Sequence, residues 1–455
     1  MDVYANNTTK KKIIEKCIDN SYQIRNKISM SMFGWKSKLY NLKDSMIYNL
    51  LNLNVAFVPQ TSSIHLLYKI YNPKEPKGLK SYNDALDKFL LFSYRSNYKE
   101  QINIKNNSVY TSDCGWGCMI RSSQMIFSRV IYKIFKYIYK GKFSSKIIIK
   151  SIIPFFMDDN IYISDMDIQT SDYIKIGMDS YIQKLNYFLE EKIKANEYKT
   201  SHIQSFDPPF SIHKICIIGE MFDRTCGEWF SDYELPKIYD IINTTFNIIP
   251  NLSILHFSSD IDMHAVIEKC FDKVENNNDK TNLNENKYFF NEKNEKFIFK
   301  KIGVIFVSVR LGLSTLSSDY YSSIKKLFEC KQFLGFIGGK VNSAMYFFGY
   351  CDDDLLFLDP HFNQKSNNNL DSENFNTYSQ KTVYKLPLKS LQSAFTIGFL
   401  FRNVKEFKEL YSFMKNFKKD ERYPCFQIHF EPYKKDDTEL QNKIKYNINN
   451  DENDF

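Results

Sequence analysis

The stretch that decides the fold is TSDCGWGCMIRSSQMIFSRVIYKIFKYIY, residues 111–139. A glycine-rich turn leads into a segment whose apolar side chains recur every three or four residues. This spacing predicts an amphipathic helix over 119–139, with Gly141 as its stop. Cys118 lies where turn and helix meet, so a thiolate there would face the positive end of the helix dipole and free backbone N–H groups. A single cysteine is more often a buried structural residue, but this setting favours a reactive nucleophile.

A second chemical signal is LLFLDPH, residues 355–361. Residues two apart on a strand face the same side, so Asp359 and His361 are predicted to lie together, although the proline between them can distort the strand end. The imidazole would act as base toward the Cys118 thiol and as acid toward the leaving group, and the carboxylate would orient the ring. Asp-Pro-His alone is more often a turn. Six other histidines lack such an acidic partner and are expected to be structural or exposed: His65, His202, His213, His256, His264 and His429.

In the C-terminal part of the sequence, the hydrophobic pattern predicts strands. The predicted strands are 302–309, 346–350, 355–359 and 395–401, the middle two forming a hairpin, and a helix follows the last. Ser231 and Glu234 have the spacing of a capping box that would open another helix. A long helix followed by mostly antiparallel strands predicts an α+β fold.

Composition limits the classes of function. The chain has 455 residues, of which 43% are hydrophobic, and 61 basic against 53 acidic residues give a net charge of only +8. This small excess argues against nucleic-acid binding. Nine cysteines without a Cys-x-x-Cys pair indicate no disulfide framework and no structural zinc site, so reduced thiols in the cytoplasm are expected, and no metal or cofactor. The N-terminus lacks the apolar core of a signal peptide, and the apolar stretch 46–58 is too short to span a bilayer.

The chain is predicted to have one folded domain with polar ends. Residues 1–60 are interpreted as a partly disordered extension, 61–432 as the catalytic domain, and 433–455 as a disordered tail. Two segments within the domain, near 274–295 and 364–380, are rich in Asn and charged residues and poor in aliphatic ones. They are predicted to be disordered surface insertions.

The chemical motifs resemble those of a known family. The segment SDCGWGCMIRSSQM, residues 112–125, is similar to the active-site segment of the autophagins, cysteine proteases that process a lipid-conjugated, ubiquitin-like autophagy modifier. Further matching motifs follow in order between about 64 and 431: FSYR at 92–95, GEWF at 227–230, VRLGL at 309–313, LGFIGGK at 334–340, YFFGY at 346–350 and LDPH at 358–361.

The resemblance implies a papain-like fold and a set of site residues. The implied catalytic triad is Cys118, His361 and Asp359. Tyr94 would lend its hydroxyl to the oxyanion hole, and Trp229 would cover the groove for the substrate tail. The loop 338–343 would rest on that tryptophan until substrate lifts it, which places three further residues in the groove: Gly338, Gly339 and Lys340. Cys114 departs from the small hydroxyl residue usual in the family, and either a tolerated small side chain or a redox partner of Cys118 would account for it.

The implied function is cleavage after the C-terminal glycine of the modifier, both to mature its precursor and to release it from phosphatidylethanolamine. The partner would be that modifier, free or lipid-conjugated, and the enzyme would meet the membrane only through the lipidated substrate. Two alternatives stay open. One is a catalytically idle protein that binds the modifier, and the other is a papain-like amidase with a different acyl donor.

Overall fold

The structure is a computed structural model that describes residues 54–99, 102–103, 109–159, 161–162, 205–206, 208–274, 288–293, 295–340, 343–366, 372–379 and 381–431. Its helices are α3 Gly78–Leu86, α4 Cys118–Ile138, α5 Ser145–Ile152, α7 Ile212–Gly219, α8 Glu234–Phe246, α9 Met263–Cys270, α10 Tyr321–Leu327, α11 Ser372–Ser379 and α12 Val404–Asp420. Short 3-10 helices occupy Ile153–Phe156, Glu220–Phe222, Ser318–Tyr320 and Leu388–Ser390. None of the helices in these ranges is long and apolar enough to span a bilayer.

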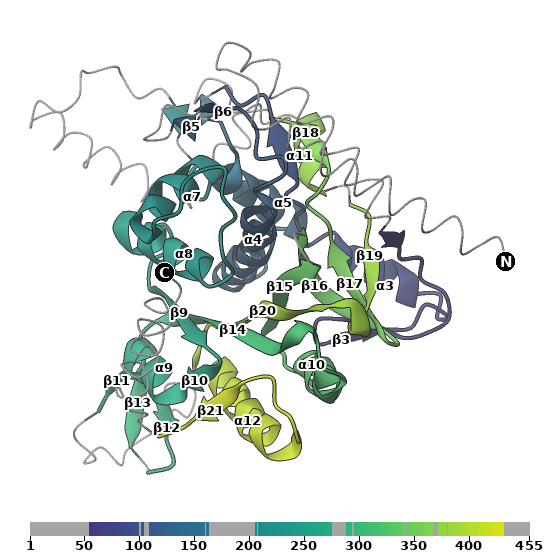
Figure 1. Ribbon diagram of the computed structural model, residues 1–455. Helices are drawn as coiled ribbons and strands as arrows, with labels where there is room; N and C mark the ends of the chain where they lie inside the picture. Colours follow the sequence, from purple (N-terminus) through teal and green to yellow (C-terminus); the bar gives the residue numbers. More distant parts are fainter. Residues whose placement is uncertain are drawn as a thin grey trace, which may run out of the picture. The chain divides into compact units, whose positions relative to one another are not determined.

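A ten-stranded sheet forms the centre of the fold (Figure 1). Its strands are β1 Val55–Ala56, β2 Ile64–Leu66, β3 Lys69–Tyr71, β9 Leu252–Ser258, β14 Ile302–Thr315, β15 Phe333–Lys340, β16 Ser343–Cys351, β17 Asp354–Leu358, β19 Tyr384–Pro387 and β20 Gln392–Phe401. They follow the order β1-β19-β17-β16-β15-β20-β14-β9, with β2 on β16 and β3 on β2. Only β14 and β9 run parallel, and the other paired neighbours are antiparallel. The predicted α+β class is confirmed.

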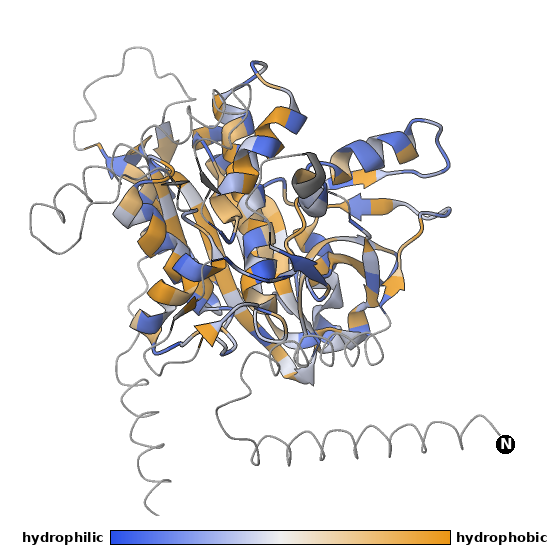
Figure 2. Ribbon diagram, turned by 90° about the horizontal axis from the view of Figure 1, so that it is seen from above, coloured by the Kyte–Doolittle hydropathy of each residue, from blue (hydrophilic) through white to orange (hydrophobic). Residues whose placement is uncertain are grey.

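Helices lie on both sides of this sheet, with α4, α7 and α8 on one side and α10 and α12 on the other (Figure 1). Apolar residues run along the central strands and the inner faces of the helices (Figure 2). Helix α4 packs closely on the sheet, because a Cβ added at Gly398 of β20 would lie 3.0 Å from Cδ1 of Ile126. The start of α4 is thereby held at a defined height above the strands.

Smaller sheets surround the centre. They consist of β11 Phe271–Lys273, β13 Lys296–Phe299 and β12 Tyr288–Phe290; β10 Asp260–Asp262 with β21 Gln427–His429; β18 Asn363–Lys365 with β4 Tyr94–Ser96; β5 Ile102–Asn103 with β6 Val109–Tyr110; and β7 Ile161–Tyr162 with β8 Ser205–Phe206. The parallel pairing of β18 with β4 matters for the site, because it joins the segment after His361 to the strand that starts at Tyr94.

Most predicted elements are confirmed. Helix α4 begins one residue earlier than predicted, at Cys118, and strand β14 extends from 302 to Thr315. The predicted hairpin is formed by β16 and β17, and Asp352 in its turn has a φ of 54°. The predicted capping box is only half formed, because one of its two hydrogen bonds is present and the other is not. Glu234 accepts a hydrogen bond from the Ser231 N–H at 2.9 Å, but Tyr233 occupies the N-cap of α8 without a side-chain hydrogen bond.

Three boundary predictions need correction. The folded part begins before 61, since Val55–Ala56 pairs with β19. Within the predicted disordered insertion 274–295, β12 adds to a three-stranded sheet and buries Phe289. Within 364–380, α11 buries Phe375 and Tyr378. In both insertions, buried aromatic side chains stabilise the described part, and residues 275–287, 294, 367–371 and 380 lie outside the described residues. Residues 1–53 and 432–455 lie outside the described residues.

Candidate active site

The loop before Cys118 needs its glycines. Gly115 has a φ of 88°, which side-chain-bearing residues rarely adopt. A Cβ added at Gly117 would lie 2.5 Å from a carboxylate oxygen of Asp113, so only glycine fits there. Trp116 fixes the turn from the other side, since its indole N–H donates to the Ser112 carbonyl oxygen at 3.1 Å. The loop therefore delivers Cys118 to the first turn of α4 in a defined orientation.

A buried ion network supports this loop. The Asp113 carboxylate, 0% exposed, accepts hydrogen bonds from Arg121 Nε at 2.6 Å, from the Arg95 N–H at 2.6 Å and from the Tyr98 hydroxyl at 2.7 Å. Arg121 also pairs with Asp158 at 2.9 Å. Buried charges are tolerated when such partners satisfy them. Asp113 and Arg121 both lie in the segment 111–139, but no sequence pattern there predicted this network.

Asp359 and His361 lie together, but not for the predicted reason. Strand β17 ends at Leu358, so strand alternation does not bring them together. Instead, Asp359 Oδ1 accepts the backbone N–H of His361 at 3.0 Å and contacts His361 Nδ1 at 2.6 Å. This is the local turn that Asp side chains favour. Tyr94 anchors the turn, because its N–H donates to the Pro360 carbonyl oxygen at 2.9 Å.

The structure brings Cys118, His361 and Tyr94 into contact. His361 and Tyr94 lie close enough to the Cys118 thiol to lower its pKa. The rings of Tyr94 and His361 meet edge to face, with centroids 5.4 Å apart. Tyr94, Cys118 and Ala344 form a small buried cluster, and Cys114 packs against it. Ala344 was not among the predicted site residues, and its backbone also lowers the pKa of the Cys118 thiol.

The electrostatics of this group favour a charged pair. Burial would raise the pKa of the Cys118 thiol, but hydrogen bonds and the charge of His361 hold that pKa below its ordinary value. Burial would lower the pKa of His361, but Asp359 and then Cys118 raise it to about 9. Burial would likewise raise the pKa of Asp359, yet its contacts with His361 and Asn54 lower it. Near neutral pH these directions favour a thiolate beside an imidazolium.

Asn54 is a further site residue that the sequence analysis missed. Its amide N–H donates to Asp359 Oδ2 at 2.6 Å, and its side-chain oxygen accepts from Lys340 Nζ at 3.2 Å. Lys340, Asn54, Asp359 and His361 thus form one polar chain. Asn54 lies in the stretch interpreted as an extension, which offers no local signal for such a contact.

A pocket of about 240 Å³ opens beside Cys118. Its wall includes Trp229, Gly338, Gly339 and Lys340, the four groove residues implied by the resemblance. Trp229 is 45% exposed, and its indole N–H donates to the Gly115 carbonyl oxygen at 3.1 Å. The tryptophan is therefore tied to the loop that carries the cysteine.

Close packing explains why both positions in the pocket wall are glycine. A Cβ at Gly338 would lie 2.5 Å from Cβ of Phe395, and one at Gly339 would lie 1.9 Å from the Ser343 carbonyl oxygen. Gly338, Gly339 and Lys340 belong to β15 and pair with β16, so this part of the expected mobile loop is a strand. Residues 341–342 lie outside the described residues.

The eight cysteines in the described ranges are all free thiols, and within those ranges no group of three metal-binding side chains comes together. The site itself supplies a thiol, an imidazole, a carboxylate and a phenol. Such a set can carry out nucleophilic attack on a carbonyl and proton transfer to the leaving group.

Comparison with known proteins gives consistent matches. The family model of the peptidase C54 catalytic domain matches residues 79–413. The cysteine protease ATG4C of Xenopus laevis is 25% identical over 433 residues, which cover 86% of this chain and 88% of that protein. ATG4C of Homo sapiens is 24% identical over 368 residues, 72% of this chain and 71% of that protein. The cysteine protease atg4 of Dictyostelium discoideum is 39% identical over 107 residues, 24% of this chain and 14% of that protein.

Proposed function

Because this chain belongs to the peptidase C54 family, the autophagins, and is a cysteine-type peptidase of papain-like fold, we propose that it cleaves after the C-terminal glycine of a ubiquitin-like autophagy modifier. The proposed cleavage has two forms: it matures the precursor of the modifier, and it releases the modifier from phosphatidylethanolamine. The proposal places the enzyme in the cytoplasm, where the lipidated substrate brings it to the membrane.

The observation that carries the proposal is the contact of Cys118 with His361, oriented by Asp359, beside the glycine-lined pocket. In the proposed first step, the Cys118 thiolate attacks the carbonyl carbon of the terminal glycine. The oxyanion that forms accepts hydrogen bonds from the Cys118 N–H and the Tyr94 hydroxyl. Collapse breaks the C–N bond, and the His361 imidazolium gives its proton to the leaving amine.

The second step hydrolyses the thioester. Neutral His361 takes a proton from a water molecule, whose oxygen attacks the acyl carbon. The tetrahedral intermediate then expels the Cys118 thiolate and releases the modifier with a free carboxylate. Throughout, Asp359 keeps Nδ1 of His361 protonated and stabilises the imidazolium, while Asn54 holds the carboxylate.

Glycine specificity follows from the groove in this proposal. A tail that passes between the Trp229 indole and the strand at Gly338 and Gly339 leaves no room for a Cβ near the scissile bond. Moving these elements apart costs free energy, which a short peptide cannot offset. A folded modifier docks through a larger surface and can supply that free energy.

A modifier with a C-terminal electrophile tests the proposal directly. The full-length protein should form a covalent adduct at Cys118, located by mass spectrometry, and Cys118→Ala should form none. Cys351→Ser is a matched control, since this thiol is accessible but lies outside the pocket, and it should react like wild type. Tight binding without an adduct would instead support an idle binding protein. Equal reaction with an unrelated acyl electrophile would support a different amidase.

A further inference from the structure

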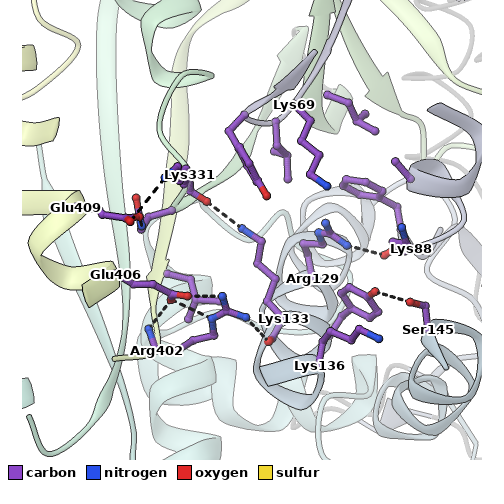
Figure 3. A pocket seen from close by; sticks show the side chains of 18 of the residues that line it. Lys69, Lys88, Arg129, Lys133, Lys136, Ser145, Lys331, Arg402, Glu406 and Glu409 are labelled. Atoms are coloured by element: carbon purple, nitrogen blue, oxygen red, sulfur yellow. Dashed lines mark hydrogen bonds and ion pairs between the residues drawn. The ribbon is translucent and has the colours of Figure 1, made fainter. Parts of the chain in front are cut away.

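A positively charged cavity lies outside the candidate active site, along the C-terminal half of α4 and beside β2, β3 and α12 (Figure 3). Its volume is about 390 Å³, within the range of small-ligand sites. Seven Lys or Arg and two Glu side chains line it. Two of these cations are paired: Lys331 with Glu409, and Arg402 with Glu406.

The other five cations are not held in an ion pair of this kind within the described residues. Within the described residues, no carboxylate forms an ion pair with any of them: Lys69, Lys88, Arg129, Lys133 and Lys136. Figure 3 shows the charged ends of Lys69, Arg129 and Lys133 extending from β3 and α4 toward the same space. Their like charges repel one another across this space; Lys69 is exposed, and the other four are half-buried.

Arg129 is the most constrained of them. Its guanidinium lies over the rings of Phe89 and Tyr132, at 4.3 and 4.9 Å from the centroids, and donates to the Lys88 carbonyl oxygen at 3.0 Å. Its Nε is buried and has no hydrogen-bond partner in the described residues. A buried charged donor without an acceptor is costly, so a ligand with acceptor oxygens would stabilise this arrangement.

Lys133 likewise has no ion-pair partner among the described residues. Its Nζ reaches only two backbone carbonyl oxygens, of Lys331 at 3.5 Å and of Phe333 at 3.4 Å. Burial lowers the pKa of Lys133 to about 7, repulsion from Arg129 and Arg402 adds to this effect, and attraction to Glu406 opposes it. Burial, with repulsion from Lys69 and Arg129, also lowers the pKa of Lys88. A multiply charged anion among these groups would reverse the repulsion and favour their protonated forms.

From the convergence of these cations on one cavity, we propose that the protein binds a phosphate-bearing ligand here, either a free phosphorylated small molecule or the phosphorylated headgroup of a lipid. Phosphate oxygens match both the fork of Arg129 and the point charges of the lysines. Arg129 and Lys136 follow Cys118 on α4 by a helical rise of roughly 16 to 27 Å. The ligand would therefore not touch the reacting atoms, and the site is separate from the peptidase function.

Two probes distinguish the sources of the phosphate. Titration calorimetry with myo-inositol hexakisphosphate measures binding of a soluble ligand to the full-length protein at about 0.15 M salt. Sedimentation compares vesicles of phosphatidylcholine alone with vesicles that also contain phosphatidylinositol 4,5-bisphosphate. Binding of the soluble probe supports a free ligand. Sedimentation only with the phosphorylated lipid supports a headgroup.

Paired variants locate the binding. Lys69→Gln/Lys133→Gln should weaken the affinity for the bound probe at least about tenfold, because it removes two charge-assisted contacts. Lys269→Gln/Lys389→Gln removes the same charge outside the cavity and should change the affinity less than about twofold. Lys88→Gln/Lys136→Gln gives a second test if the first variant does not fold. Equal weakening in the cavity and control variants, or no binding of either probe by wild type, would overturn the proposal.

Discussion

Replacing Asp359 by Asn should reduce activity in a way that depends on pH. The change keeps the shape of the side chain but removes the charge that, with the short contact to Nδ1, raises the pKa of His361 to about 9. If that pKa returned to the ordinary histidine value of 6.5, the difference would correspond to about 3 kcal/mol. In the variant, Cys118 would still raise this pKa and burial would still lower it, so this figure gives the scale of the expected change.

The loss of activity should be larger at alkaline pH, because the protonated form of His361 gives its proton to the leaving amine. At pH 8, a group with a pKa of about 9 is roughly 90% protonated, whereas one with a pKa of 6.5 is about 3% protonated. The Asn variant should therefore lose about thirtyfold in kcat/KM at pH 8. At pH 6 both forms are mostly protonated, and this effect should be less than about twofold. The alkaline limb of the pH profile should move from about 9 toward 6.5.

The assay is the initial rate of cleavage of a fluorescent modifier fusion, measured as kcat/KM between pH 5.5 and 9.5. Asp354→Asn is the control, since Asp354 lies on β17 but pairs with Lys385 rather than with His361. It should leave the profile unchanged. A loss of the same factor at pH 6 and pH 8, or an alkaline limb that does not move, would refute the reasoning about His361.

Cys118→Ala should abolish cleavage while modifier binding, measured by calorimetry, stays near wild type; turnover within tenfold of wild type would exclude Cys118 as nucleophile. Asp113→Asn should destabilise the protein by about 3 kcal/mol or more in urea unfolding, because it breaks a buried pair with Arg121, and an unchanged midpoint would contradict this. A fusion whose terminal Gly is replaced by Ala, and the isolated tail peptide, should both be poor substrates; efficient cleavage of either would mean that Trp229 does not close the groove. Peroxide should inactivate the enzyme reversibly through Cys118, and Cys114→Ser should slow recovery by a reductant if Cys114 resolves the oxidised thiol. Unchanged recovery would leave Cys114 as a tolerated small side chain.

The basic cavity and the candidate active site share helix α4 but differ in their tests. Removing cavity lysines should leave kcat/KM unchanged on a soluble fusion, because those side chains lie outside the pocket at Cys118. Binding of a phosphorylated probe can therefore be judged without reference to peptidase activity.

The local elements and the chemical groups of the site could be predicted from neighbouring residues. The apolar period over 119–139 predicted α4, and the glycines before Cys118 placed a thiol at its start. The strands β14, β16, β17 and β20 were equally predictable. These features depend on local backbone geometry and on the periodic spacing of apolar side chains. Both can be recognised from residues that are close together in the sequence.

Only the tertiary structure decided which distant groups meet. Asn54 reaches Asp359 across 305 positions of the chain, and Arg121 pairs with Asp158 from another segment. Phe289 and Tyr378 are buried within segments whose polar composition predicted disorder. Such contacts form only when helices and strands pack together. The partners of a buried charge or ring are then the groups that lie next to it in the folded structure. No local pattern in the sequence encodes that choice.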